Sequence, residues 1–190
     1  MRMKNLTKEE EIKSSEPKEG VYYAANDYAG LLKRYFIIGV DLTIIYIFSM
    51  FVIVAFFDLP EKRELLIVSK LHVVFFISYI YLVLVKRSDW GTLGYILTGV
   101  RIVSLEGEKV PIWNMTLRFL LLIFGPIHFI LDVLYLSGDK YKQTARDKIV
   151  GTYVIAQDAV PIGRGEQMYV SYFFFGWSIV FREVKMSSQQ

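Results

Sequence analysis

The hydrophobic residues of this chain are gathered in three long runs instead of recurring at the short intervals of a soluble domain. The first run covers about Leu31 to Phe57, the second about Leu65 to Val85, and the third Trp113 to Leu136. A helix of about 20 apolar residues can cross the roughly 30 Å hydrocarbon layer of a bilayer. The pattern therefore predicts an integral membrane protein in which the first two runs form full transmembrane helices.

The third run contains Gly125-Pro126 near its centre, and a proline there interrupts helical hydrogen bonding. The run can be a kinked single crossing, or it can enter the membrane and return as a re-entrant hairpin. We favour the hairpin, because the basic segment that follows then stays on the cytoplasmic side. Two β-rich stretches, Val100–Leu105 and Lys148–Ala156, can also pair in that arrangement. The predicted fold class is all-α, with two full transmembrane helices, a broken third apolar segment and a small cytoplasmic β element.

Polar segments flank this apolar region at both ends of the chain. Residues 1–27 are polar and of mixed charge, so we expect a flexible N-terminal tail. Residues 28–156 would form the transmembrane domain, and residues 157–190 a separate C-terminal segment. Within the latter, residues 168–181 are rich in aromatic side chains but too few for a comfortable crossing. They predict an aromatic interfacial anchor, or a helix packed along the spans.

Basic residues are concentrated in the loop after the second run and at the entry of the first run. Because positively charged loops remain in the cytoplasm, we expect a multi-pass protein of the cell membrane with a cytoplasmic N-terminus. Three short spans enclose little volume, so we also expect a homo-oligomer within the lipid bilayer.

Composition excludes several other classes of function. The net charge of +3 comes without a basic stripe interleaved with aromatic residues, so nucleic-acid binding is not expected. The chain has no cysteine, which excludes disulfides and thiol catalysis. It also lacks the motifs of phosphate-binding loops, zinc proteases and serine hydrolases. We therefore expect no enzyme, no cofactor and no metal centre.

Asp41 is the acidic residue that interrupts the first apolar run. A carboxylate at such a depth costs about 2.5–3.5 kcal/mol, so it needs a partner from another segment. Since a cation and a proton compete for the same carboxylate oxygens, Asp41 could couple the exchange of the two. The alternative is a buried ion pair with Arg118 or Arg34 that fixes how the spans pack.

Three further residues are candidates for ion or proton coupling. His128 and Asp132 are four residues apart, so they would share one helix face and could bind a cation or relay protons. Alternatively, His128 caps the broken helix and Asp132 is solvated near the cytoplasmic end. Asp147 lies in a basic polar segment, where we expect it to bind backbone amides or neighbours such as Arg146, or to pair with Arg34 where the first span begins.

Four segments, in this order, resemble the RDD family of small membrane proteins: KRYFIIGVDL, WGTLGYILTGVRIVSLEG, LRFLL and QTARDKIVGTYVI. The resemblance covers about Tyr28 to Ala156. It places the arginine of the family name on Arg34 and the first aspartate on Asp41. The second aspartate falls on Asp147, with Asp132 as the alternative.

Other positions both support and depart from this resemblance. Arg101 and Arg118 fit further basic positions of the family pattern. The family's middle motif resembles Thr-Pro-Gly-Lys, whereas this chain reads Thr-Leu-Gly-Tyr at residues 92–95. The resemblance implies two functions. One is a monovalent cation/proton antiporter that uses a buried aspartate; the other is a non-catalytic membrane scaffold or assembly subunit whose Arg and Asp residues form structural ion pairs.

Overall fold

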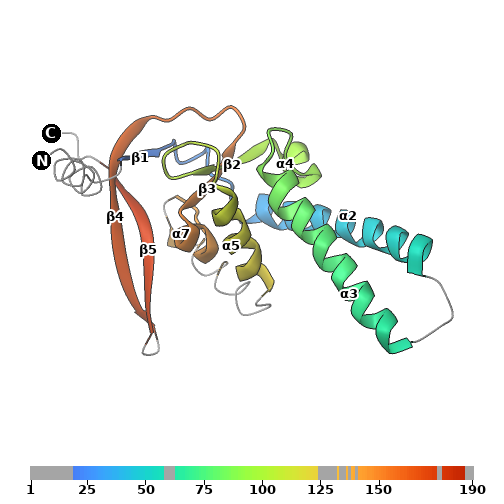
Figure 1. The fold of residues 1–190 in the computed structure, drawn as a ribbon. Coiled ribbons are helices and arrows are strands. Elements are labelled where there is room, and N and C mark those ends of the chain that lie inside the picture. Colours follow the sequence, from blue (N-terminus) through green and yellow to red (C-terminus); the bar gives the residue numbers. More distant parts are fainter. Residues whose placement is uncertain are drawn as a thin grey trace, which may run out of the picture.

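The computed structural model describes residues 19–57, 63–123, 132, 136, 138, 139, 141–174 and 177–186. Long helices extend to one side of the molecule, and most of the strands lie on the other (Figure 1). The elements are β1 Glu19–Tyr22, α2 Leu31–Phe57, α3 Arg63–Tyr79, the π-helix η1 Ile80–Val85, α4 Leu93–Thr98, β2 Val100–Ser104, α5 Ile112–Ile123, α7 Ala145–Val150, β3 Thr152–Ala156, β4 Gly163–Phe174 and β5 Trp177–Met186.

Within the described chain, α2 is the single helix that is long and apolar enough to cross a membrane, over Leu31–Phe56. The apolar part of the next helix, Ser69–Val85, extends about 26 Å, which is less than the roughly 30 Å of a hydrocarbon core. Polar residues at the start of α3 account for the shorter apolar length. The prediction of two full transmembrane helices is therefore wrong.

Two antiparallel sheets also overturn the prediction of an all-α fold class. The two β-rich stretches pair as expected, with β2 against β3 and Val100 opposite Ala156, but residues 148–150 of the second stretch lie in α7 and not in the strand. A second sheet has the order β1-β4-β5, and residues 168–174 and 177–181 of the aromatic-rich stretch lie in its strands β4 and β5. Aromatic and β-branched side chains favour strands, which explains why this stretch does not form the alternative helix. An interfacial role for the hairpin stays a prediction.

The sheet formed by β2 and β3 divides the core in two, because successive side chains of a strand point to opposite faces. One face contributes Val100, Ile102 and Val154 to a cluster with residues of α2, α5 and η1. The other face packs against a group of buried tyrosines, in which the rings meet edge to face or tilted. These tyrosines are Tyr23, Tyr28, Tyr141 and Tyr153.

The two central strands are preceded by the same sequence of local structures. Each follows a six-residue helix that ends in a left-handed glycine, Gly99 after α4 and Gly151 after α7. Thr92 and Thr144 occupy the position before these helices. Glycine adopts the left-handed conformation without a Cβ penalty, so it can end the helix and turn the chain into the strand. The two helix–glycine–strand units therefore meet as a pair through their antiparallel strands.

The third apolar run begins as α5, which has 12 residues. Its predicted break at Gly125-Pro126 lies outside the described residues. α5 packs against α7, where the Asn114 side chain donates to the Val150 carbonyl over 3.1 Å.

Strands near the two ends of the chain also pair. β1 lies antiparallel to β4, with Glu19 opposite Glu166 and Tyr22 opposite Gly163. Segments distant in sequence thus surround the central strands.

Candidate functional site

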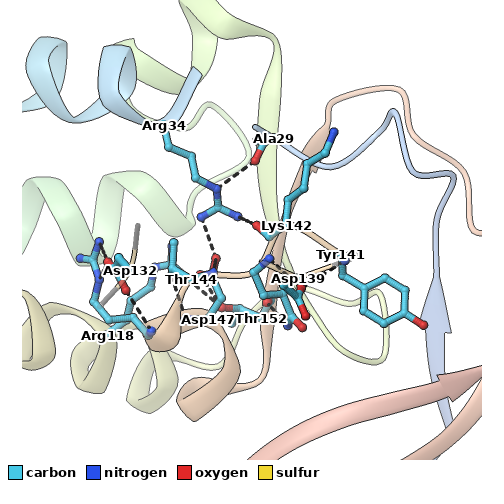
Figure 2. Close-up of polar contacts among 12 residues, drawn as sticks. Ala29, Arg34, Arg118, Asp132, Asp139, Tyr141, Lys142, Thr144, Asp147 and Thr152 are labelled. Carbon is cyan, nitrogen blue, oxygen red and sulfur yellow. Dashed lines mark hydrogen bonds and ion pairs between the residues drawn. The ribbon is translucent and has the colours of Figure 1, made fainter. Parts of the chain in front are cut away.

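Asp147 is fully buried at the start of α7 and connects three elements (Figure 2). Its backbone N–H donates to Thr144 Oγ1 over 3.2 Å, and the Thr144 N–H donates to Asp147 Oδ2 over 3.1 Å. This reciprocal pair is a capping box, which satisfies the free amides at a helix start. Arg34 Nη1 lies 2.6 Å from Asp147 Oδ2, and Arg118 Nη1 contacts Oδ1. One carboxylate therefore links α7 to both α2 and α5.

The other two nitrogens of the Arg34 guanidinium donate hydrogen bonds to backbone carbonyls. Its Nε donates to the Ala29 carbonyl over 3.0 Å, and its Nη2 donates to the Lys142 carbonyl over 2.9 Å. Figure 2 shows the guanidinium between these two segments and Asp147. The predicted pairing of Asp147 with Arg34 is thus present, and the guanidinium fastens the first turn of α2 to the segment that precedes α7.

The ionised form of Asp147 is strongly favoured. Burial alone would raise the pKa of this carboxyl, but the charges of Arg118 and Arg34 outweigh that effect. The Thr144 N–H adds a hydrogen bond to the charged form. Together these groups hold the pKa of Asp147 well below its ordinary value, so the carboxylate remains charged over the physiological pH range.

Asp41 lies seven residues after Arg34 on α2 and is held by a different set of donors. Lys86 Nζ is 2.9 Å from Oδ2, and the Thr92 hydroxyl donates to the same oxygen over 3.1 Å. The Gly94 N–H donates to Oδ1 over 3.1 Å, and the Tyr81 hydroxyl donates to it over 3.4 Å. The partners predicted for Asp41, Arg118 and Arg34, bind Asp147 instead.

The π-helical segment η1 explains how Lys86 and Tyr81 reach one carboxylate. These residues are five positions apart, which in an α-helix places side chains on different faces. A π-helix has hydrogen bonds between residues five apart, so it brings such residues toward the same face. Lys86 also lies over the ring of Tyr95, with Nζ 4.5 Å from the ring centre. Local helix geometry therefore selects the counter-charge of Asp41.

Glycine is required at position 94 by the close approach of α4 to α2. A Cβ at Gly94 would lie 2.8 Å from Asp41 Oδ1 and 2.8 Å from the Ile37 carbonyl oxygen. Without a side chain, the Gly94 amide can reach the carboxylate directly. Thr92 and Gly94 belong to the segment that departs from the family's middle motif, and both of these positions bind Asp41.

Asp132 forms the third buried pair. Arg146 Nε donates to Asp132 Oδ2 over 2.5 Å, its Nη2 contacts the same oxygen, and its backbone N–H donates to Oδ1 over 3.3 Å. Asp132 is 5% exposed, so the alternative in which it is solvated is wrong. His128, its predicted partner in a proton relay, lies outside the described residues.

The contacts of Asp41 include residues that sequence reasoning did not single out. Lys86 directly follows the second apolar run, and Tyr81 lies within it. A spacing of five residues does not indicate a shared helix face unless the π-helical turn is known. The Thr-x-Gly pair at residues 92 and 94 was visible in the family resemblance and was the signal that could have identified this part of the site.

A cavity of about 90 Å³ lies beside these pairs. Its walls come from α2, η1, α4, α5 and the residues around α7, and they combine apolar side chains with both signs of charge. The charged residues that line it are Arg34, Asp41, Lys86, Arg118, Asp132 and Arg146. Every acid that lines the cavity is therefore already in contact with a base.

This arrangement can lock the helices onto the central sheet. Each buried acid is neutralised by a base from another part of the chain, which makes separation of the elements unfavourable. Among the described residues, no group of three or more His, Asp or Glu side chains is arranged to hold a metal ion.

Comparison with known proteins shows which family this chain belongs to. The model of the RDD family matches residues 28–151, a region that includes Arg34, Asp41, Asp132 and Asp147. No curated protein and no solved structure matches the chain. Because the family match extends over well more than half of its residues, the chain belongs to the RDD family.

Proposed function

We propose that this protein is a non-catalytic membrane scaffold or assembly subunit whose buried ion pairs hold its helices against its sheets. RDD proteins are generally membrane-associated, and α2 is apolar and long enough to cross a bilayer. The observation that carries the proposal is the neutralisation of every acid in the buried network. The pairs are Asp41 with Lys86, Asp132 with Arg146, and Asp147 with Arg34 and Arg118.

Buried acids that are already paired with bases favour a fixed structure over repeated ion transport. Removing one partner of a buried pair leaves an uncompensated charge in a low dielectric, which is strongly unfavourable. A cation that entered the Asp41 site would have to displace Lys86 and would meet the other basic side chains nearby. The network is therefore better suited to holding a shape than to repeated binding and release of cations.

Flux measurements on the reconstituted protein test this proposal. We expect proteoliposomes to show no proton movement on addition of sodium or potassium beyond that of protein-free liposomes. Asp41→Asn should lower the unfolding temperature and leave this baseline unchanged. The matched control is Asp89→Asn, because Asp89 is an exposed acid paired with Lys109. A sodium- or potassium-driven flux that disappears in Asp41→Asn but not in Asp89→Asn would contradict the scaffold.

One observation favours cation/proton antiport as a second candidate. Asp41 and Lys86 both line the cavity, and the hydroxyls of Thr92 and Tyr81 lie within hydrogen-bond distance of the same carboxylate. An exchanger would bind a sodium or potassium ion on these oxygens in place of the Lys86 ammonium, in exchange for a proton moved the other way. For an exchanger, Lys86→Met should abolish coupling between the two ions. For a scaffold, the same variant should lose stability alone.

The proposal also includes a cytoplasmic N-terminus and assembly of the chain into a homo-oligomer. Large apolar side chains cover the outer surface of α2, where Phe51 is 67% exposed and Phe56 is 72% exposed. Such a surface suits lipid or a second copy of the chain. Basic residues near the start of α2 support a cytoplasmic N-terminus by the positive-inside rule.

A further inference from the structure

The cavity beside the ion pairs carries more positive than negative charge. Four bases and two acids line it. Asp147 does not line the cavity but contacts two of the lining bases, Arg34 and Arg118. When Asp147 is counted as well, the bases still exceed the acids by one. A free cation is repelled by such a site, whereas an anion is attracted to it.

Two of the guanidinium groups have N–H donors without a partner among the described residues. Toward the described residues, Arg118 donates through Nη1 alone, and Arg146 through Nε and Nη2. An arginine carries five N–H donors in a planar fork that suits phosphate oxygens. The remaining N–H groups of both side chains have no partner in the part of the chain that the structure describes, and both residues line the cavity.

The rest of the cavity wall is apolar and continues onto the outer surface of α2. Ile38, Leu42 and Leu122 contribute to the lining. Leu42 is also 52% exposed, and Phe36 on the same helix is 54% exposed, so the cavity adjoins the surface of α2 that would face lipid. A ligand here would meet positive charge at one end and an apolar surface at the other.

We propose that this cavity binds the phosphate headgroup of an anionic phospholipid, with an acyl chain lying along the apolar side of α2. The volume of about 90 Å³ can hold several water molecules or one phosphate-sized group. The anion would complete the hydrogen bonding of Arg118 and Arg146 and balance the surplus positive charge. This inference goes beyond the scaffold proposal, because it assigns a lipid ligand to the network.

Thermal unfolding of the full chain in a neutral detergent tests the site. Phosphatidylglycerol, added in mixed micelles, should raise Tm by at least about 3 °C more than phosphatidylcholine with the same acyl chains, since a ligand stabilises the state that binds it. Inorganic phosphate, which lacks the acyl chain, should give a much smaller shift. Equal shifts with the two lipids would overturn the proposal, and a full shift with inorganic phosphate would overturn the lipid assignment.

A matched pair of variants locates the response. Leu122→Trp places a larger side chain in the cavity and should remove the phosphatidylglycerol shift. Leu120→Trp adds the same side chain to α5 at a position that is 44% exposed, and it should keep the shift. A shift that Leu122→Trp leaves unchanged would exclude the cavity as the site.

A measurement on the unmodified protein covers the case in which Leu122→Trp fails to fold. Protein equilibrated with equal amounts of phosphatidylglycerol and phosphatidylcholine should retain mainly phosphatidylglycerol after size-exclusion chromatography in detergent. Retention of the two lipids in equal amounts would contradict an anion-selective site.

Discussion

Asp147 and Asp41 are both buried acids, but they are neutralised by different groups. Asp147 receives two guanidiniums and a helix cap, whereas Asp41 receives one ammonium, two hydroxyls and a glycine amide. Arginine is charged at any physiological pH and offers several fixed donors, so the Asp147 site is the more rigid of the two. We therefore regard Asp147 as the residue on which the joint between helices and sheet depends most.

Asp147→Asn should destabilise the protein severely. The substitution leaves Arg34 and Arg118 buried beside a neutral amide, and loss of one partner of a buried pair costs about 3–5 kcal/mol. Urea unfolding of the detergent-solubilised protein measures this change in the free energy of unfolding. Asp89→Asn should cause no measurable loss, because the side chain of Asp89 is 86% exposed and surface pairs contribute little. Equal stability of the two variants would show that Asp147 is not the anchor.

The stability contributed by Asp147 should depend on pH in one direction. Its folded pKa lies below the ordinary value because of Arg118 and Arg34, whereas in the unfolded chain it is near 3.9. Stability from this group is thus fully present above about pH 4 and is lost as the pH falls toward the folded pKa. We expect the decline in unfolding temperature below pH 4 to be less steep in Asp147→Asn. Parallel pH profiles for the two proteins would argue against this linkage.

Gly94→Ala should separate α4 from α2. The new Cβ would lie 2.8 Å from both Asp41 Oδ1 and the Ile37 carbonyl oxygen, and overpacking of this kind costs about 1–3 kcal/mol. Gly39→Ala is the control, because a Cβ at Gly39 on α2 meets nothing within 4 Å. Alanine is the better helix former, so that change should be neutral or stabilising. Thermal unfolding of both variants checks the expected difference.

At the scale of elements, the central sheet is built from two similar units. In each, a threonine precedes a six-residue helix, a left-handed glycine ends it, and a five-residue strand follows. α2 contacts both units through its side chains. Arg34 reaches the start of α7, and Asp41, two turns later, reaches the start of α4. The seven-residue spacing on α2 thus matches the separation of the two short helices.

The β4–β5 hairpin is attached to this centre by Lys148 of α7. Its Nζ lies 2.7 Å from Asp139 Oδ1 and 2.6 Å from Glu183 Oε1 on β5. The side chain is 7% exposed, so the contact is shielded from water. A scaffold that presents the hairpin to a partner would depend on this contact for its orientation.

Lys148→Gln should loosen the hairpin without unfolding the helices. Glutamine cannot neutralise Asp139 and Glu183, so β5 should lose its ion pair with α7 and keep only contacts such as that of Arg182 with the Val150 carbonyl. Hydrogen exchange followed by mass spectrometry should then show faster exchange in peptides of β5 and unchanged exchange in α2. Lys185→Gln changes an exposed lysine on the same strand and should leave both rates as they are. Unchanged exchange in Lys148→Gln would mean that other contacts fix the hairpin.

At the scale of the whole molecule, α2 extends away from most of the strands (Figure 1), and many of its large apolar side chains are exposed. Charged residues of the network lie toward the first half of α2, near its junction with the strands. In the proposed scaffold, this arrangement would place the apolar helix in the bilayer and the sheets at one membrane surface. The proposed orientation puts that surface in the cytoplasm.

The absence of cysteine from the chain allows this orientation to be tested with single cysteines. Asp158→Cys lies at an exposed position between β3 and β4. In intact cells it should resist a membrane-impermeant maleimide, and after permeabilisation it should react fully. The cysteine-free chain controls for background labelling. Labelling of intact cells to the same extent would place the sheets outside.

Local pattern was sufficient for some features of this protein. The apolar run from Leu31 predicted α2, and the β-rich character of two short stretches predicted the β2–β3 pair. The pairing of Arg34 with Asp147 was one of the alternatives predicted for Asp147, because Arg34 lies where the first apolar run begins. These features depend on composition, periodicity and order along the chain, which the sequence displays directly.

Other features depended on contacts between distant segments. Aromatic residues at 168–181 are compatible with a membrane anchor, a helix or a strand, and pairing of β4 with β1 and β5 selected the strand. Lys86 pairs with Asp41 because the π-helical segment η1 turns its side chain toward α2, and α4 packs closely against α2. The sequence alone therefore determined a long apolar helix, a pair of central strands and the family pattern of charges. Only the tertiary structure decided which base neutralises which acid, because that choice depends on the distances between elements after they have packed.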